Sequence, residues 1–134
     1  MKKYLFPIAI ITTLFFASCT DQTATPGSDD RDKFTGDWLC TETIAGTPTT
    51  FTININKEGL SDTINIRNFS GYGSSANALG FVNGNSLTIP GQEIGVTNIP
   101  VQGSGIYSDP LSGEKISMNY STDGQSASAT CVRN

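Results

Sequence analysis

The sequence contains no histidine, and only 15% of its 134 residues are charged. Histidine is the commonest general base near neutral pH and the commonest metal ligand in proteins. Without it, neither a Ser-His-Asp triad nor a histidine-bound zinc can form. The chain also lacks the G-x-S-x-G nucleophile elbow, and Gly71-Tyr72-Gly73 and Gly103-Ser104-Gly105 are only fragments of a phosphate-binding motif. We therefore predict that the protein is not an enzyme and has neither a cofactor nor a metal site.

Basic residues are scarce as well, with 8 Lys and Arg against 12 Asp and Glu. Two of the basic residues are Lys2 and Lys3, so the remainder of the chain is more acidic than the total suggests. Proteins bind nucleic acids and anionic membrane surfaces through basic patches. The sequence therefore predicts no nucleic-acid partner, and it leaves the oligomeric state open.

No apolar run is long enough to span a bilayer comfortably, which takes ~20 residues. The main apolar stretch, Tyr4–Phe16, is interrupted by one proline and two threonines. It follows two lysines and ends in the small residues Ala17 and Ser18. A positive start, an apolar run and small residues are typical of a secretory signal peptide. We predict a signal peptide over residues 1–18, with an uncleaved N-terminal anchor as the alternative.

A cysteine follows the small residues directly. The stretch Phe15-Phe16-Ala17-Ser18-Cys19 resembles the lipobox of bacterial lipoproteins. The resemblance implies cleavage between Ser18 and Cys19 and a diacylglycerol on the Cys19 sulfur, with acyl chains such as palmitate. Two or three acyl chains anchor a protein stably, whereas one does not. It implies a lipid-anchored protein of the cell envelope, on the periplasmic or the surface-exposed face of the outer membrane. An ordinary signal peptide that ends at a cysteine is the alternative.

Residues 20–33 have no large apolar side chain and are rich in Thr, Ser, Asp, Pro and Gly. Such a segment buries too little apolar surface to offset its ordering entropy. We predict a flexible tether, so that the lipidated cysteine and the tether cover residues 19–33. Its aspartates lack the D-x-D-x-D-G spacing of a calcium loop, and we interpret them as solvated charges.

The two remaining cysteines are Cys40 and Cys131. Two cysteines in a secreted domain indicate one disulfide. A zinc site would need further ligands from carboxylates, so the disulfide is the preferred interpretation.

From Phe34 onward, apolar and polar residues alternate in short runs separated by turn residues. The expected strands include 51–56, 63–67, 76–82, 87–89, 99–107, 116–120 and 127–132. No segment has helical periodicity over three turns. We predict an all-β domain of about eight short strands, and short connections favour antiparallel neighbours in chain order. This describes a small up-and-down β-barrel, with a β-sandwich as the alternative. A Cys40–Cys131 disulfide supports closure, because it joins the first strand to the last.

The first strand opens with Phe34-Thr35-Gly36-Asp37-Trp38, an F-x-G-x-W stretch. It resembles the G-x-W signature of lipocalins and other calycin barrels, in which this tryptophan packs across the closed bottom of the barrel. Residues 34–134 also resemble small lipocalin-like lipoproteins of Bacteroidota, including the ending Ala129-Thr130-Cys131. The resemblance implies a lipocalin-like barrel over 34–134, much shorter than true lipocalins and without an evident C-terminal helix.

The stretch 69–77 is glycine-rich, uncharged and contains two aromatic residues, Phe69 and Tyr72. Loops on rigid scaffolds often carry binding, so we predict Phe69, Tyr72 and Trp38 as ligand or loop contacts. In the alternative, this stretch is a connection whose Phe69 fills the core. The sequence favours a non-catalytic lipoprotein that binds a small apolar or amphipathic molecule. A structural or protein-interaction lipoprotein with a filled barrel is the alternative, and a hydrolase with a carboxylate pair is the least favoured.

Overall fold

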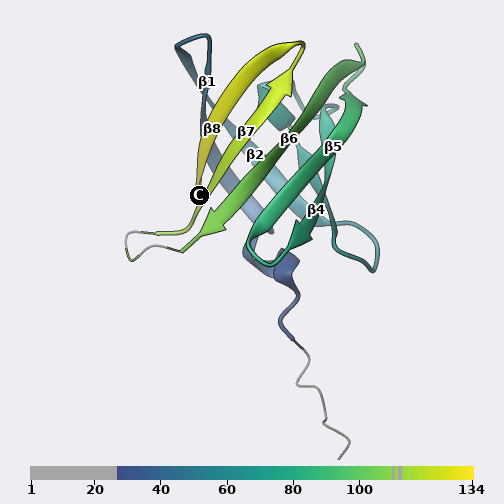
Figure 1. The fold of residues 1–134 in the computed structure, drawn as a ribbon, viewed down its shortest axis with the longest axis vertical. Coiled ribbons are helices and arrows are strands. Elements are labelled where there is room, and N and C mark those ends of the chain that lie inside the picture. Colours follow the sequence, from purple (N-terminus) through teal and green to yellow (C-terminus); the bar gives the residue numbers. More distant parts are fainter. Residues whose placement is uncertain (1–26, 110, 112) are drawn as a thin grey trace, which may run out of the picture.

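The computed structural model describes residues 27–134, apart from 110 and 112, as a closed eight-stranded barrel (Figure 1). The strands are β1 (Gly36–Ile44), β2 (Thr47–Lys57), β3 (Thr63–Arg67), β4 (Asn77–Asn83), β5 (Ser86–Ile94), β6 (Ile99–Ser108), β7 (Lys115–Thr122) and β8 (Gln125–Arg133). Each strand pairs antiparallel with the next, and β1 pairs with β8. The predicted up-and-down barrel is therefore confirmed, and the sandwich alternative is wrong. The predicted signal peptide, Cys19 and the first part of the tether lie outside the described residues.

The barrel closes where β1 meets β8. The register runs from Trp38 opposite Arg133 to Ile44 opposite Ala127, and it places Cys40 directly opposite Cys131. The two cysteines form a disulfide. Two strands at opposite edges of an open sheet could not be bonded in this way, so the predicted link between disulfide and closure holds.

Side chains fill the interior because each strand turns alternate residues inward. The fully buried side chains include Trp38, Phe34, Phe69, Ile53, Ile55, Ile64, Ile66, Leu87, Ile89, Ile94, Ile116 and Met118. Gly103 allows β6 and β7 to pack closely, since a Cβ on it would lie 2.3 Å from the Cβ of Tyr120. The β4–β5 turn falls on Gly84 and Asn85, so β4 extends one residue beyond the expected strand 76–82. Among the described residues, no helix could cross a membrane.

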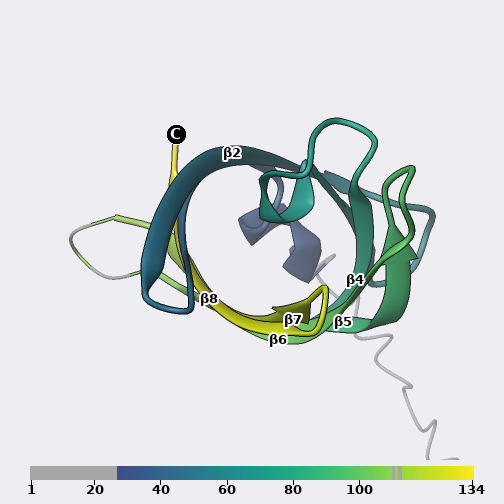
Figure 2. The same cartoon turned by 90° about the horizontal axis from the view of Figure 1, so that it is seen from above.

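A short 3₁₀-helix, η1 (Asp30–Lys33), lies at one end of the barrel, called here the lower end (Figures 1 and 2). At this end, Trp38 is fully buried and its indole N–H donates to the carbonyl of Phe34 at 2.7 Å. The Arg133 guanidinium lies 4.3 Å from the centroid of the Trp38 ring. Aromatic packing and a cation–π contact therefore close the lower end.

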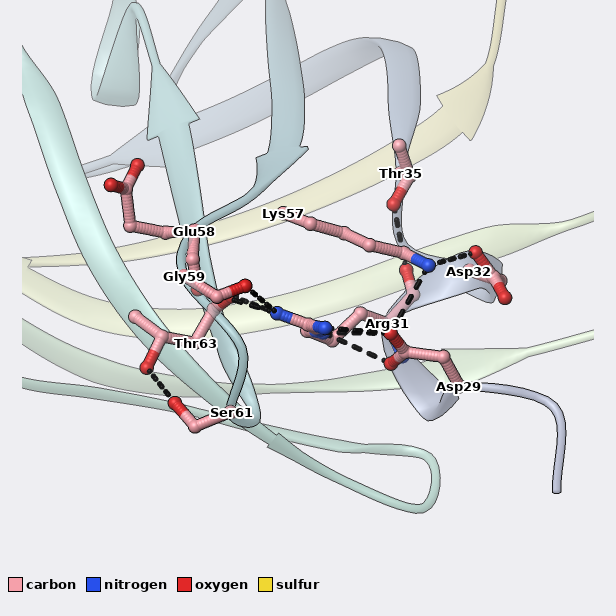
Figure 3. A network of polar contacts seen from close by, with 9 residues as sticks. All are labelled: Asp29, Arg31, Asp32, Thr35, Lys57, Glu58, Gly59, Ser61 and Thr63. Atoms are coloured by element: carbon pink, nitrogen blue, oxygen red, sulfur yellow. Dashed lines mark hydrogen bonds and ion pairs between the residues drawn. The ribbon is translucent and has the colours of Figure 1, made fainter. Parts of the chain in front are cut away.

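Arg31 of η1 is buried at this end, with 7% of its surface exposed. Its guanidinium pairs with Asp29 at 2.7 Å and donates to the carbonyls of Glu58, Gly59 and Thr63 at 3.2–3.3 Å (Figure 3). Lys57 reaches Asp29 as well. Contacts with the barrel thus include the last residues of the predicted tether, and a charged side chain rather than an apolar one makes them.

Candidate functional site

The opposite, upper end of the barrel is covered by the connection between β3 and β4, which contains the 3₁₀-turn η2 (Phe69–Gly71) (Figure 2). Asn68 and Ser70 both have positive φ, of 58° and 55°. A left-handed conformation costs energy in residues other than glycine and often marks a functional segment. The Asn68 side chain fixes the turn by donating to the carbonyl of Thr52 at 2.8 Å and accepting from the N–H of Gly73 at 2.7 Å.

Beneath η2 lies a buried carboxylate, that of Glu42, with 4% of its surface exposed. Alternation along β1 turns Glu42 inward together with Trp38 and Cys40. One carboxylate oxygen, Oε1, accepts hydrogen bonds from the Tyr120 hydroxyl and from Ser70 Oγ, the latter at 2.5 Å. No salt bridge to Glu42 is present among the described residues. Hydroxyl donors therefore offset the cost of burying this side chain.

Tyr120 supplies both a donor and an aromatic wall at this site. Burial raises the pKa of Tyr120, and the hydrogen bond to Glu42 raises it further. The hydroxyl consequently stays protonated at physiological pH and donates to the carboxylate. The Tyr120 ring packs against Phe69 with 4.7 Å between centroids, so the side chain that fixes Glu42 also supports η2.

The second carboxylate oxygen of Glu42, Oε2, accepts no hydrogen bond from a described residue, since both bonds to this side chain go to Oε1. In the part of the chain that the structure describes, Asn65 Oδ1 is the only fully buried polar side-chain atom without a partner. A carboxylate oxygen can accept two hydrogen bonds, so Oε2 presents an open acceptor at the upper end.

The structure brings together two of the three residues predicted to contact a ligand. Phe69, the first residue of η2, is fully buried, as the alternative interpretation expected, while Tyr72 is 41% exposed at the rim. The Tyr72 hydroxyl accepts a hydrogen bond from Thr122 Oγ1 at 3.3 Å. Trp38 lies at the lower end and takes no part in this cluster. Thus Tyr72 is the predicted contact that a ligand at the upper end can reach.

The other predicted site residues are the cysteines. Cys40 and Cys131 are fully buried in the β1–β8 wall, and Cys19 lies outside the described residues. Over residues 27–134, leaving out 110 and 112, no group of three or more His, Cys, Asp or Glu is placed to hold a metal ion.

Glu42 is not among the predicted site residues, although the sequence contains a signal for it. Glu42 has the same strand parity as Trp38 and Cys40, so a strand over 36–44 turns all three residues to one face. A glutamate on the apolar face of a strand is unusual. The inward alternation therefore indicated a buried carboxylate, but it gave no indication of its partners.

No protein-family model, curated protein or solved structure matches this chain. The all-antiparallel barrel is compatible with a lipocalin-like fold.

Proposed function

We propose that the protein is a non-catalytic, lipid-anchored lipoprotein of the bacterial cell envelope that binds a small molecule at the upper end of its barrel. The observation that carries the proposal is the buried carboxylate of Glu42, whose Oε2 accepts no hydrogen bond from a described residue. Pockets that combine apolar walls with a few inward polar groups are typical binding sites. The aromatic side chains of Phe69, Tyr72 and Tyr120 supply such walls.

The geometry also restricts the chemistry of the ligand. A carboxylate is an acceptor only, so the ligand needs an amine or hydroxyl group to donate to Glu42. The interior below Glu42 is filled by buried side chains, Ile53 and Met118 among them, and leaves little room for a long acyl tail. We therefore expect a small amphipathic molecule with a donor group at one end and an apolar part against the aromatic rim.

The position of the tether agrees with this assignment. The chain enters the barrel at the lower end, through η1 (Figure 1). If Cys19 carries the lipid, the connection to the membrane leaves from this end. The upper end, with Glu42 and Tyr72, is then free to meet molecules from the surrounding compartment.

The proposal is tested by mass spectrometry of the full protein taken from the envelope of its cells. A mass present under native conditions and absent after denaturation is the ligand. Glu42→Gln keeps the shape of the side chain but removes its charge, and we expect it to lose this mass. Glu114→Gln is the matched control, because Glu114 also accepts from a tyrosine, Tyr107, but at the lower end. An equal ligand mass in both variants, or none in the wild type, contradicts the assignment.

The same denatured spectra test the anchor. Lipidation predicts a chain that starts at Cys19 and carries acyl groups, and Cys19→Ala should leave an uncleaved, unlabelled precursor. An acylated product from Cys19→Ala would show that the lipid is attached elsewhere.

A second candidate function is a protein-interaction module with a filled barrel. It is favoured by apolar side chains on the outer wall, where Leu79 and Phe81 of β4 are each 42% exposed and Ile106 of β6 is 54% exposed. Exposed apolar groups on a neighbouring set of strands are typical of interaction surfaces. A hydrolase stays the least favoured, since the groups bonded to the Glu42 carboxylate are hydroxyls and not a second carboxylate.

A further inference from the structure

The outer wall of the barrel is hollowed near the upper end, where β5, β6 and β7 lie side by side (Figure 1). The hollow has a volume of about 490 Å³, which is in the range of small-molecule sites. Glu93 of β5, Gln102 of β6 and Ser121 of β7 line it, and the β7–β8 turn borders it at Gly124. It is separate from Glu42, which points into the barrel.

A β-bulge forms one side of the hollow. The β5–β6 register shifts between Ile89 and Gln92. Two residues of β5, Pro90 and Gly91, therefore face the single residue Gln102 of β6. A bulge interrupts the ladder of hydrogen bonds, and a proline has no N–H to contribute to it. Gly91 has no side chain to fill the space, since a Cβ on it would lie 3.5 Å from Gln102 Oε1.

The polar side chains of the hollow are not engaged elsewhere in the described part of the chain. Glu93 and Gln102 are exposed, and Ser121 is half-buried. None of the three side chains forms a hydrogen bond or an ion pair with another described residue. A carboxylate only accepts hydrogen bonds, whereas an amide and a hydroxyl both donate and accept. The hollow therefore offers both kinds of hydrogen bond to a ligand.

The charge of the hollow restricts the ligand further. Among the described residues that line it, Glu93 is the one with a charge. An anionic ligand would be repelled by Glu93 and would find no basic partner. A molecule with several hydroxyl groups satisfies all three side chains, because each hydroxyl donates to Glu93 or exchanges hydrogen bonds with Gln102 and Ser121. These are the groups of an uncharged sugar.

A row of uncharged polar side chains continues from the hollow across the wall. The row starts two residues along β6 from Gln102 and crosses β7, β8 and β1 in register; its members are Ser104, Asn119, Ser128 and Thr43. Neighbouring members are about 4.8 Å apart in the direction of the strand pairing. They alternate with buried residues on each strand and so face outward. Sugar units that follow the first can therefore keep hydrogen-bonding partners along the wall.

We propose that the hollow and this row form a binding site for an oligosaccharide without acidic groups. One sugar unit occupies the hollow against Glu93, Gln102 and Ser121, and the next units lie along the row. The site does not rest on a ligand at Glu42, because it is on the outer wall. It lies near the upper end, away from η1, where the chain enters the barrel.

The test uses the full protein in detergent and a panel of hexasaccharides. The neutral members are built of glucose, xylose, mannose or N-acetylglucosamine, and the anionic member is built of galacturonic acid. Affinities come from isothermal titration calorimetry, and the contact is located by NMR shifts of the Gln102 and Ser121 amides. We expect at least one neutral hexasaccharide to bind and to shift both amides, and the anionic one to do neither.

Variants of the hollow test the assignment of its residues. Glu93→Ala and Gln102→Ala each remove hydrogen bonds to the sugar and should weaken binding about tenfold. Glu58→Ala is the matched control, because Glu58 is an exposed glutamate in the β2–β3 connection, outside the hollow. Its affinity should equal that of the wild type. A double variant of the row, Asn119→Ala with Ser128→Ala, should weaken the hexasaccharide but not a disaccharide of the same sugar.

The proposal is overturned if no neutral hexasaccharide binds, or if the anionic one binds equally well. It is also overturned if Glu93→Ala and Gln102→Ala bind as tightly as the wild type. Binding that persists in Glu93→Ala but disappears in Glu42→Gln would place the sugar at the barrel end. That result would overturn the wall site and support the proposed function, so the two proposals fail separately.

Discussion

Reduction of the Cys40–Cys131 disulfide should destabilise the protein strongly without opening the barrel. The two cysteines are 91 residues apart in the sequence. Cross-linking a chain over such a loop restricts the unfolded state, and the chain-entropy relation gives about 4.6 kcal/mol at 25 °C. Since domains of this size are stable by only ~5–15 kcal/mol, the bond supplies a large share of the total. The corresponding fall in Tm is about 20 °C.

The folded state should keep its shape when the bond is broken. The β1–β8 ladder extends well beyond the cysteines, from Trp38 opposite Arg133 to Ile44 opposite Ala127. These hydrogen bonds and the buried side chains keep β1 paired with β8 even when the two thiols are free. The reduced protein should therefore have the near-ultraviolet circular dichroism spectrum of the oxidised barrel and unfold at a lower urea concentration.

The assay is urea unfolding followed by fluorescence of the single tryptophan, Trp38, which is fully buried. The difference in unfolding free energy between the oxidised and the reduced wild type measures the effect of the cross-link alone, because both forms retain the sulfur atoms and hence the packing. A Cys40→Ala and Cys131→Ala double variant should fall lower still, since both positions are fully buried and truncation leaves a cavity. A difference below ~1 kcal/mol between the oxidised and reduced protein would refute the entropic argument.

Three further predictions concern packing and pH. Gly103→Ala should destabilise by about 1–3 kcal/mol, because the new Cβ would meet Tyr120; Gly91→Ala, where the nearest atom is 3.5 Å away, is the control, and equal urea midpoints would contradict the argument. Hydrogen bonds from Arg31 hold the pKa of Asp29 below its ordinary value of 3.8. The stability that the ionised Asp29 contributes is therefore present above pH 3.8 and is lost as the pH falls below it. The Asp29→Asn variant should flatten the dependence of the urea midpoint on pH below about 4. Burial raises the pKa of Tyr120 above its ordinary value of 10.0, so its contribution to stability is complete below pH 10 and is lost as the pH rises above it. Spectrophotometric titration of tyrosinate should show that Tyr120 ionises only when the protein unfolds. Ionisation of every tyrosine in the folded protein would disprove this.

The barrel could be predicted from the sequence because the signals for its strands and turns lie within short stretches of the chain. Period-two alternation, as in Phe51–Asn56, identifies a strand within a few residues, and short turns fix antiparallel neighbours. An alternating pattern cannot predict that the first strand lies beside the last. The two cysteines supplied that long-range contact, between β1 and β8. The error at β5 was local as well. The expected strand 87–89 stops before Pro90, whereas β5 continues to Ile94 because its last residues pair with β6.

The two ends of the barrel could not be predicted because their contacts join distant residues. Arg31 is ordered by carbonyls 27–32 residues away, and composition alone assigned it to a tether. Glu42 bonds to Ser70, 28 residues away, and to Tyr120, 78 residues away. Alternation along β1 indicated that Glu42 points inward, but only the closed sheet brings its donors to it.

The physics of the two ends indicates which of them opens at lower cost. At the lower end, the cation of Arg31 binds a carboxylate and backbone carbonyls from β3 and the β2–β3 connection, so opening exposes several charged and polar groups at once. At the upper end, η2 contains two non-glycine residues with positive φ, Asn68 and Ser70, and opening it releases backbone strain. Strained, locally held segments open more readily than core elements. A ligand that donates to Glu42 can replace the Ser70 hydroxyl and thereby offset the hydrogen bond lost when η2 moves. The upper end is thus favoured as the binding end by its energetics as well as by its open acceptor.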